Sequence, residues 1–162
     1  MTQKPKDKLA IVVFSGDLDK ALVAFMLAIT GASMAMEVTM FFTFWGLNII
    51  RKDRDGTKKK GLTRKILNFF NPGGSKRLRL SAHHVLGLGT WMMKRQMNNI
   101  DMPAVDELIT MAHDSRVKFI ACTTGMELLG LTKDSFRSEV DEFAGSATFL
   151  SEATKAKTSL FI

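Results

Sequence analysis

The sequence predicts an α/β domain with a mainly parallel sheet of about five strands. Short apolar runs rich in β-branched and aromatic residues recur along the chain, and segments with helical apolar spacing separate them. No two of these runs are joined by a two-residue hairpin turn. Because parallel strands need crossover connections, helices should cover both faces of the sheet. The 162 residues are enough for a single domain with its own core.

The first strand is expected over residues 8–14 (KLAIVVF), because this run is short, apolar and β-branched. It ends in a Ser-Gly-Asp turn, in which Asp17 is a candidate N-cap. The helix that follows carries apolar residues at helical spacing as far as Gly31. Its uncharged stretch, 21–36, is shorter than a bilayer span requires, so we expect a buried helix.

A second strand is expected over residues 37–43 (EVTMFFT), with a short helical stretch over 47–51. Residues 52–80 then break the pattern, because charge, glycine and proline leave little side-chain surface to bury. This segment is predicted to be a basic loop or helical excursion, with one amphipathic turn around 66–70. A methionine-rich helix over 81–99 follows it.

The second half of the chain alternates helices and strands. Pro103 favours a helix start, which places a helix over 104–114. The clearest strand of the chain is 117–121 (VKFIA), which leads through Cys122 into a helical run over 126–131. The remaining expected elements are a weaker strand over 139–143, a helix over 144–156 and a last strand over 159–162.

The formal net charge of +7 is concentrated in one segment. Residues 51–79 contain 11 Lys/Arg and 2 Asp, which gives this segment +9 and leaves −2 for the rest of the chain. Its GTKKKG and GGSK stretches lack the strand-to-helix setting of a phosphate-binding Walker loop. A solvated loop is therefore the expectation, with a polyanion site as the alternative, and no specific nucleic-acid partner is predicted.

Cys122 is the only cysteine, which excludes an intramolecular disulfide and CxxC redox chemistry. The apolar run near the N-terminus is short and lacks a signal-peptide cleavage pattern, so a reducing cytoplasmic location is expected.

His83 and His84 are adjacent, and their side chains would diverge by about 100° on a helix. Neither a metal site nor a cofactor is predicted.

Three distinctive loops follow expected strands, at the sheet edge where parallel α/β folds bind ligands. Cys122 lies in one of them, just before a helix, where unpaired N–H groups favour a thiolate; the other interpretation is a buried structural cysteine. Asp17 also fits a plain helix cap, and Trp45 fits either a pocket floor or packing at the sheet edge. The candidate pocket residues around Cys122 are Thr123, Thr124, Gly125, Ser15, Gly16, Asp17, Trp45 and Gly46.

The order of these segments resembles the DsrE/DsrF/DsrH-like family, and in particular its branch of small sulfurtransferases. The resemblance is carried mainly by FFTFWGLN and by IAC-x-x-x-M-x-x-x-G, and it extends over most of the chain outside 52–80. It implies a three-layer α/β/α fold with flavodoxin-like layering, and a persulfide-carrying cysteine that falls on Cys122. Some relatives carry a second cysteine, which this chain lacks.

The function expected from the residues and the resemblance together is that of a sulfurtransferase or sulfur carrier. Cys122 would take sulfane sulfur as a persulfide and pass it to a partner thiol, so the expected partners are sulfur donors and acceptors, either proteins or small thiols. The alternative is a non-catalytic module that binds a small ligand or a protein, with a structural Cys122. Membrane association is possible for the family but is not favoured.

A homo-oligomer is also expected; the resemblance favours a trimer or hexamer, and symmetry also allows a dimer. The predicted helix over 81–99 carries apolar residues over more of its circumference than one core-facing stripe needs. Its methionines at 92, 93 and 97 are therefore interpreted as core or subunit contacts and not as a cofactor site.

Overall fold

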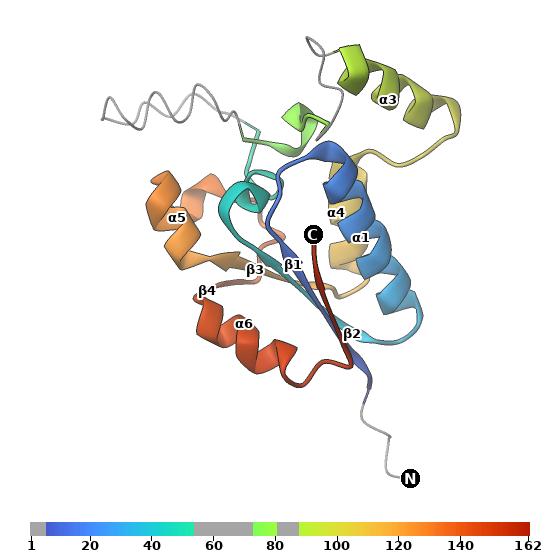
Figure 1. Ribbon diagram of the computed structural model, residues 1–162. Coiled ribbons are helices and arrows are strands. Elements are labelled where there is room, and N and C mark those ends of the chain that lie inside the picture. Colours follow the sequence, from blue (N-terminus) through green and yellow to red (C-terminus); the bar gives the residue numbers. More distant parts are fainter. Residues whose placement is uncertain (1–5, 54–72, 81–87) are drawn as a thin grey trace.

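The computed structural model describes residues 6–53, 73–80 and 88–162, which form a five-stranded sheet between helices (Figure 1). The strand order is β4-β3-β2-β1-β5, and every neighbouring pair is parallel. This confirms the predicted α/β fold with a parallel sheet. The strands are β1 (Lys8–Val13), β2 (Glu37–Phe42), β3 (Lys118–Cys122), β4 (Glu142–Ala144) and β5 (Thr158–Phe161).

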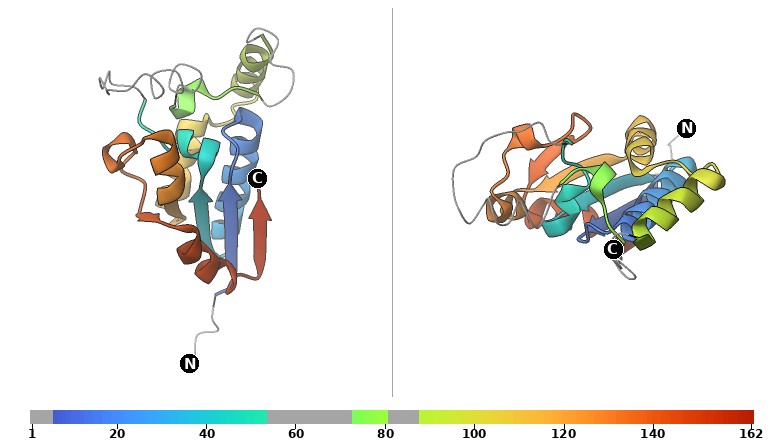
Figure 2. Two further views of the ribbon diagram at one scale, coloured as in Figure 1. Left: turned by 60° about the vertical axis from the view of Figure 1, so that its left-hand side comes forward. Right: turned by 90° about the horizontal axis from the view of Figure 1, so that it is seen from above.

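The helices lie in layers on the two faces of the sheet (Figure 2). On one face α1 (Leu18–Ser33) packs beside α4 (Val105–Asp114), and on the other lies α6 (Ser146–Ala153). Helix α3 (Leu88–Asn99) projects beyond the start of α1, and α5 (Thr123–Leu129) follows β3 directly (Figure 1). Three 3-10 turns complete the described elements: η1 (Phe44–Asn48), η2 (Ser75–Arg77) and η3 (Lys133–Ser135).

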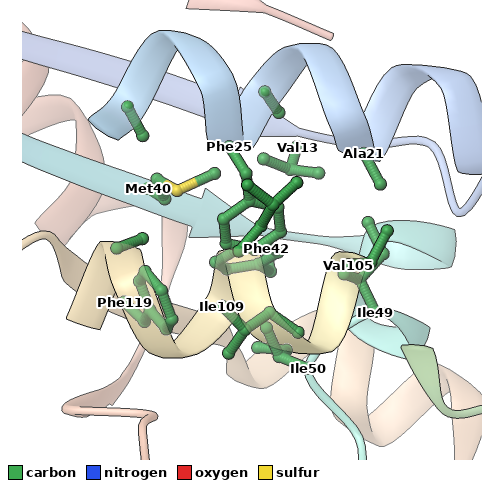
Figure 3. Close-up of a cluster of buried hydrophobic side chains, with 14 of the residues drawn as sticks. Val13, Ala21, Phe25, Met40, Phe42, Ile49, Ile50, Val105, Ile109 and Phe119 are labelled. Carbon is green, nitrogen blue, oxygen red and sulfur yellow. The ribbon is translucent and has the colours of Figure 1, made fainter. Parts of the chain in front are cut away.

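The larger core lies between the sheet and the pair α1 and α4 (Figure 3). At its centre Phe25, Phe42 and Phe119 are fully buried, and the rings of Phe42 and Phe119 meet edge to face with centroids 5.6 Å apart. The opposite face carries a much smaller cluster. Its buried members are Ala10, Phe41, Ile120, Cys122, Ala144 and Phe149.

The boundaries of several predicted elements shift. The helical stretch expected over 47–51 is the 3-10 turn η1 and begins at Phe44. Helix α5 begins directly after Cys122 and not at 126, and Pro103 precedes the N-cap position of α4. The predicted turn around 66–70 and the first seven residues of the helix over 81–99 lie outside the described residues.

An ion-pair network fastens residues 73–80 to the main body. Arg137 bonds Asp106 and Glu139, and Ser75 donates its hydroxyl to the same Asp106 carboxylate. Burial alone would raise the pKa of Asp106, but the hydrogen bonds from Ser75 and Arg137 and the charges of Arg137 and Lys76 hold that pKa below its usual value.

In the described part of the chain, no helix is long and apolar enough to cross a membrane.

Candidate functional site

Cys122 is the last residue of β3 and the N-cap of α5. Its backbone is extended (φ −70°, ψ 116°), and its Sγ accepts a hydrogen bond from the Gly125 N–H at 3.5 Å. The helix ends at its C-cap, Gly130, which adopts the left-handed conformation that favours glycine. The sequence thus places one sulfur atom at the carboxyl edge of the sheet, within reach of a backbone N–H donor.

Of the three loops predicted to meet at this edge, the loop after β2 contains η1 and contacts the other two. The Gly46 N–H donates to the Phe14 carbonyl at 2.8 Å, which ties η1 to the loop after β1. On its other side η1 meets α5, because a β-carbon built on Gly125 would lie 3.0 Å from Leu47 Cδ1 and 3.1 Å from the Phe44 nitrogen. Glycines at these positions therefore allow the loops to approach closely.

The side chain of Cys122 is buried on the α6 side of the sheet and is only 2% exposed. Its neighbour across the sheet is Ala144 of β4, in register with it. On the other side of β3, Ala121 is in register with Phe42 of β2. Cys122 and Thr43 are the next residues along these two chain segments. The thiol therefore lies inside the smaller apolar cluster and not in an open crevice.

Ser15 and Asp17 form a compact unit in the loop after β1. The Ser15 hydroxyl donates to Asp17 Oδ2 at 2.7 Å, and Lys20 Nζ lies 3.2 Å from the same oxygen. Asp17 occupies the N-cap position of α1, but its side chain makes no capping hydrogen bond. None of the hydrogen bonds described for this pair reaches Cys122, so the structure brings the loops together without joining these side chains to the thiol.

The remaining predicted residues take different positions around this edge. Thr123 is partly buried and Thr124 is exposed. Trp45 is 43% exposed, and its carbonyl oxygen lies close to Gly16, where an added β-carbon would come within 2.7 Å of it. Gly16 and Gly46 thus serve close backbone packing.

Two sets of aromatic contacts were missed by the sequence analysis. Phe149 of α6 stacks on Phe41 of β2, with centroids 4.9 Å apart, and closes the cluster that contains the thiol. A second aromatic group is exposed: the Phe14 ring lies 5.3 Å from that of Phe44 and 5.8 Å from that of Phe161. These contacts join residues that are far apart in sequence. The one sequence signal for them is that several of the aromatic residues lie next to predicted strand ends.

The chemistry available at this edge is that of one sulfur atom, a backbone N–H donor and an apolar wall. Among residues 6–53, 73–80 and 88–162, no group of three His, Cys, Asp or Glu side chains is placed to hold a metal ion. His113 is exposed, and His83 and His84 lie outside the described residues.

Comparison with known proteins identifies the family. Residues 5–161 match the DsrE/DsrF/DrsH-like family. The chain belongs to this family. That finding confirms the resemblance carried by the FFTFWGLN and IAC-x-x-x-M-x-x-x-G segments, and it covers almost the whole sequence.

Two relatives of the DsrE/DsrF/DrsH-like protein are similar over nearly their full length. An uncharacterized protein, YrkE of Bacillus subtilis, is 38% identical over 162 residues and covers 100% of both chains. The sulfur carrier protein DsrE2 of Allochromatium vinosum is 34% identical over 164 residues, which cover 96% of this chain and 98% of the relative. Among solved structures, the ychN protein from E. coli shares the fold, with a TM-score of 0.59 and 11% identity over 96% of this chain and 99% of that one.

Proposed function

We propose that this protein is a sulfur carrier that holds sulfane sulfur as a persulfide on Cys122. The observation that carries the proposal is the position of its Sγ, at the end of a parallel strand, where it accepts the Gly125 N–H. A backbone N–H at this position can donate a hydrogen bond to a sulfur atom that carries or passes on sulfane sulfur, and thiolate sulfur is the nucleophile in thiol chemistry. The 34% identical DsrE2 sulfur carrier supports the same role.

The proposed transfer needs one cysteine and no external oxidant. The Cys122 thiolate attacks the outer sulfur of a donor persulfide, a new S–S bond forms, and the donor leaves as its thiolate. An acceptor thiolate then attacks the outer sulfur of the Cys122 persulfide, and Cys122 leaves as a thiolate. The net reaction moves one sulfur atom from donor to acceptor, and the carrier returns to its starting state.

Intact-mass spectrometry under nondenaturing conditions tests this proposal. After incubation with polysulfide, the wild type should gain about 32 Da, and dithiothreitol should remove that mass. The matched control is Cys122→Ala, which has no thiol and should gain nothing. A wild-type mass that stays unchanged in polysulfide and in a donor persulfide would count decisively against the proposal.

A second candidate function rests on the burial of Cys122, which is 2% exposed. On this hypothesis the chain is a non-catalytic module that binds a small ligand or a protein, and the thiol only fills the cluster beside Phe149. Partner binding would then survive Cys122→Ser unchanged, whereas a sulfur carrier would lose every transfer that passes through the thiol. Sulfur transfer to an acceptor thiol therefore separates the two functions.

The partners that follow from the leading proposal are a sulfane-sulfur donor and an acceptor thiol, on proteins or small molecules.

We also propose that the chain forms a single domain that works as a homo-oligomer in a reducing compartment. Helix α3 supports the assembly, because Trp91 and Met92 are each more than half exposed on a helix whose one buried side chain described is that of Met97.

A further inference from the structure

A buried thiol cannot exchange sulfur in the conformation described above. Attack on an S–S bond needs the nucleophile, the attacked sulfur and the leaving sulfur to approach a line, and Cys122 is only 2% exposed. The polypeptide over the thiol must therefore move before a donor can reach it. Two elements border Cys122: α5, which begins at the next residue, and α6, whose Phe149 shares its cluster.

Helix α5 is poorly suited to move. Its Gly125 lies against η1 so closely that even a methyl group there would come within 3.0 Å of Leu47 Cδ1. Leu47 is fully buried in the larger core, and Met126 beside Gly125 is buried in it as well. Displacing α5 would therefore disturb η1 and the larger core together.

Helix α6 is held much more weakly. It buries a single side chain, Phe149, whereas α1 buries seven residues on the opposite face. Its N-cap is Gly145, which supplies no side-chain cap. The side-chain hydrogen bonds described between α6 and the strands are long, with Lys8 Nζ and Ser159 Oγ each 3.5 Å from their partners on Glu152 and Ala153.

The start of α6 also lies directly beside the thiol. Ala144, two residues before the helix, is in register with Cys122. A β-carbon built on Gly145 would have Thr123 Oγ1 as its nearest neighbour, at 4.0 Å. Movement of this short helix about Gly145 would lift Phe149 from Phe41 and open the cluster on its α6 side.

We propose that α6 is a lid over Cys122 and that Phe149 is the residue that holds it closed. This inference rests on the proposed function for its purpose, because it explains how a sealed thiol becomes available to donor and acceptor. Opening is local: the strands, α1, α4 and the larger core keep their places while α6 moves. Phe149 acts through the position of the helix and takes no part in the sulfur transfer itself.

Native-state alkylation of Cys122 tests the lid without any sulfur donor. The rate of reaction with iodoacetamide is measured across low urea concentrations, beside the global unfolding curve of the same protein. A local opening exposes little surface, so the alkylation rate should change little with urea well below the unfolding transition. If the rate instead rises with the full urea dependence of global unfolding, Cys122 reacts only from the unfolded chain and the lid does not exist.

Three variants assign the opening to α6. Phe149→Ala should raise the alkylation rate in zero urea by about tenfold or more, because it removes the buried side chain of the helix. Gly145→Ser adds a capping hydroxyl at a position with room for it, and should slow alkylation about twofold. Phe143→Ala is the matched control: it truncates an aromatic residue of β4 that packs against the larger core, so it should lower global stability and leave the urea-independent rate unchanged.

The outcomes separate the lid from the sulfur-carrier proposal. If polysulfide adds sulfur to the wild type while Phe149→Ala and Gly145→Ser leave the alkylation rate unchanged, the lid is wrong and the carrier proposal stands. If both variants shift alkylation as expected while no variant ever gains sulfur, the lid stands and the carrier proposal fails. An equal acceleration in Phe149→Ala and Phe143→Ala would overturn the lid, because it would show only a general loss of stability.

Discussion

Gly46 passes so close to Val13 that a β-carbon built on it would lie 2.1 Å from the Val13 carbonyl oxygen. The contact is between backbone atoms, so no side-chain rotation can relieve it. We predict that Gly46→Ala lowers the free energy of unfolding by more than about 2 kcal/mol, because η1 must separate from β1. Urea unfolding followed by circular dichroism measures this loss.

Gly145→Ala is the control for that substitution. Gly145 has an extended backbone (φ −85°, ψ 173°) that any residue adopts, and its nearest neighbour to an added β-carbon is 4.0 Å away. Its unfolding midpoint should stay close to that of the wild type. Equal losses in the two variants would show that the Gly46–Val13 approach is not what constrains η1.

The apolar surroundings of Cys122 predict an order of stability for its variants. Cys122→Ala leaves a small cavity among apolar neighbours and should cost about 1 kcal/mol of unfolding free energy. Cys122→Ser places a hydroxyl group in the same apolar cluster and should cost about 1–2 kcal/mol more. Chemical denaturation of both variants checks the order, and a serine variant as stable as the alanine variant would contradict it.

The network around Arg137 predicts a loss of stability in acid. Although burial opposes it, hydrogen bonds and the Arg137 charge lower the pKa of both Asp106 and Glu139 in the folded protein. The unfolded chain therefore binds more protons as the pH falls, so the contribution of the network is fully present above about pH 4.5 and is lost progressively as the pH falls through the lowered pKa values of the folded protein. The three side chains are 17–24% exposed, so this contribution is not strongly screened by solvent.

Arg137→Met provides the measurement. At pH 7 it should lower the free energy of unfolding by about 1–3 kcal/mol, because it removes the guanidinium group that bonds two partly buried carboxylates. The difference from wild type should shrink as both carboxylates are protonated, and urea unfolding at several values between pH 7 and pH 3 follows it. A difference that stays constant over this range would show that the two ion pairs contribute nothing.

The exposed residues of α3 predict self-association. Trp91 is 56% exposed and Met92 is 58% exposed, and such residues are enriched at protein interfaces. Light scattering of the wild type at micromolar concentration should return a multiple of the 18.0 kDa chain mass, with a trimer or hexamer expected. Trp91→Glu should lower that mass, whereas Leu128→Glu, on the exposed side of α5, should not. A wild type of 18.0 kDa would refute the assembly.

Much of the fold could be predicted from the sequence, because its strands are buried on both faces and read as continuous apolar runs. The runs around Ile11, Phe41 and Ile120 are the three inner strands β1, β2 and β3. The edge strand β4 is only three residues long and was correspondingly the weakest prediction. The register and the pairing of β5 with β1 depend on contacts between distant segments, which no local pattern specifies.

The candidate site was predicted only in part, for a related reason. A strand end followed by a helix start locates Cys122 at the carboxyl edge, and the small residues Gly16 and Gly46 mark the loops that meet there. The sequence does not specify which face of the sheet the thiol occupies, because one residue of shift in a strand end reverses the face. The packing of Phe149 in the same cluster as Cys122 could therefore not be predicted from the sequence.

The placement of β5 has a consequence for how the chain folds during synthesis. Of the five described strands β1 is made before the others, yet one of its two neighbours is β5, which is made after the other four, and the Phe14 N–H donates to the Ile162 carbonyl at 2.8 Å. One edge of β1 therefore has unsatisfied backbone groups until residues 158–162 have left the ribosome. An unpaired, apolar strand edge is a site for aggregation, and pairing with β5 is what removes this site from β1.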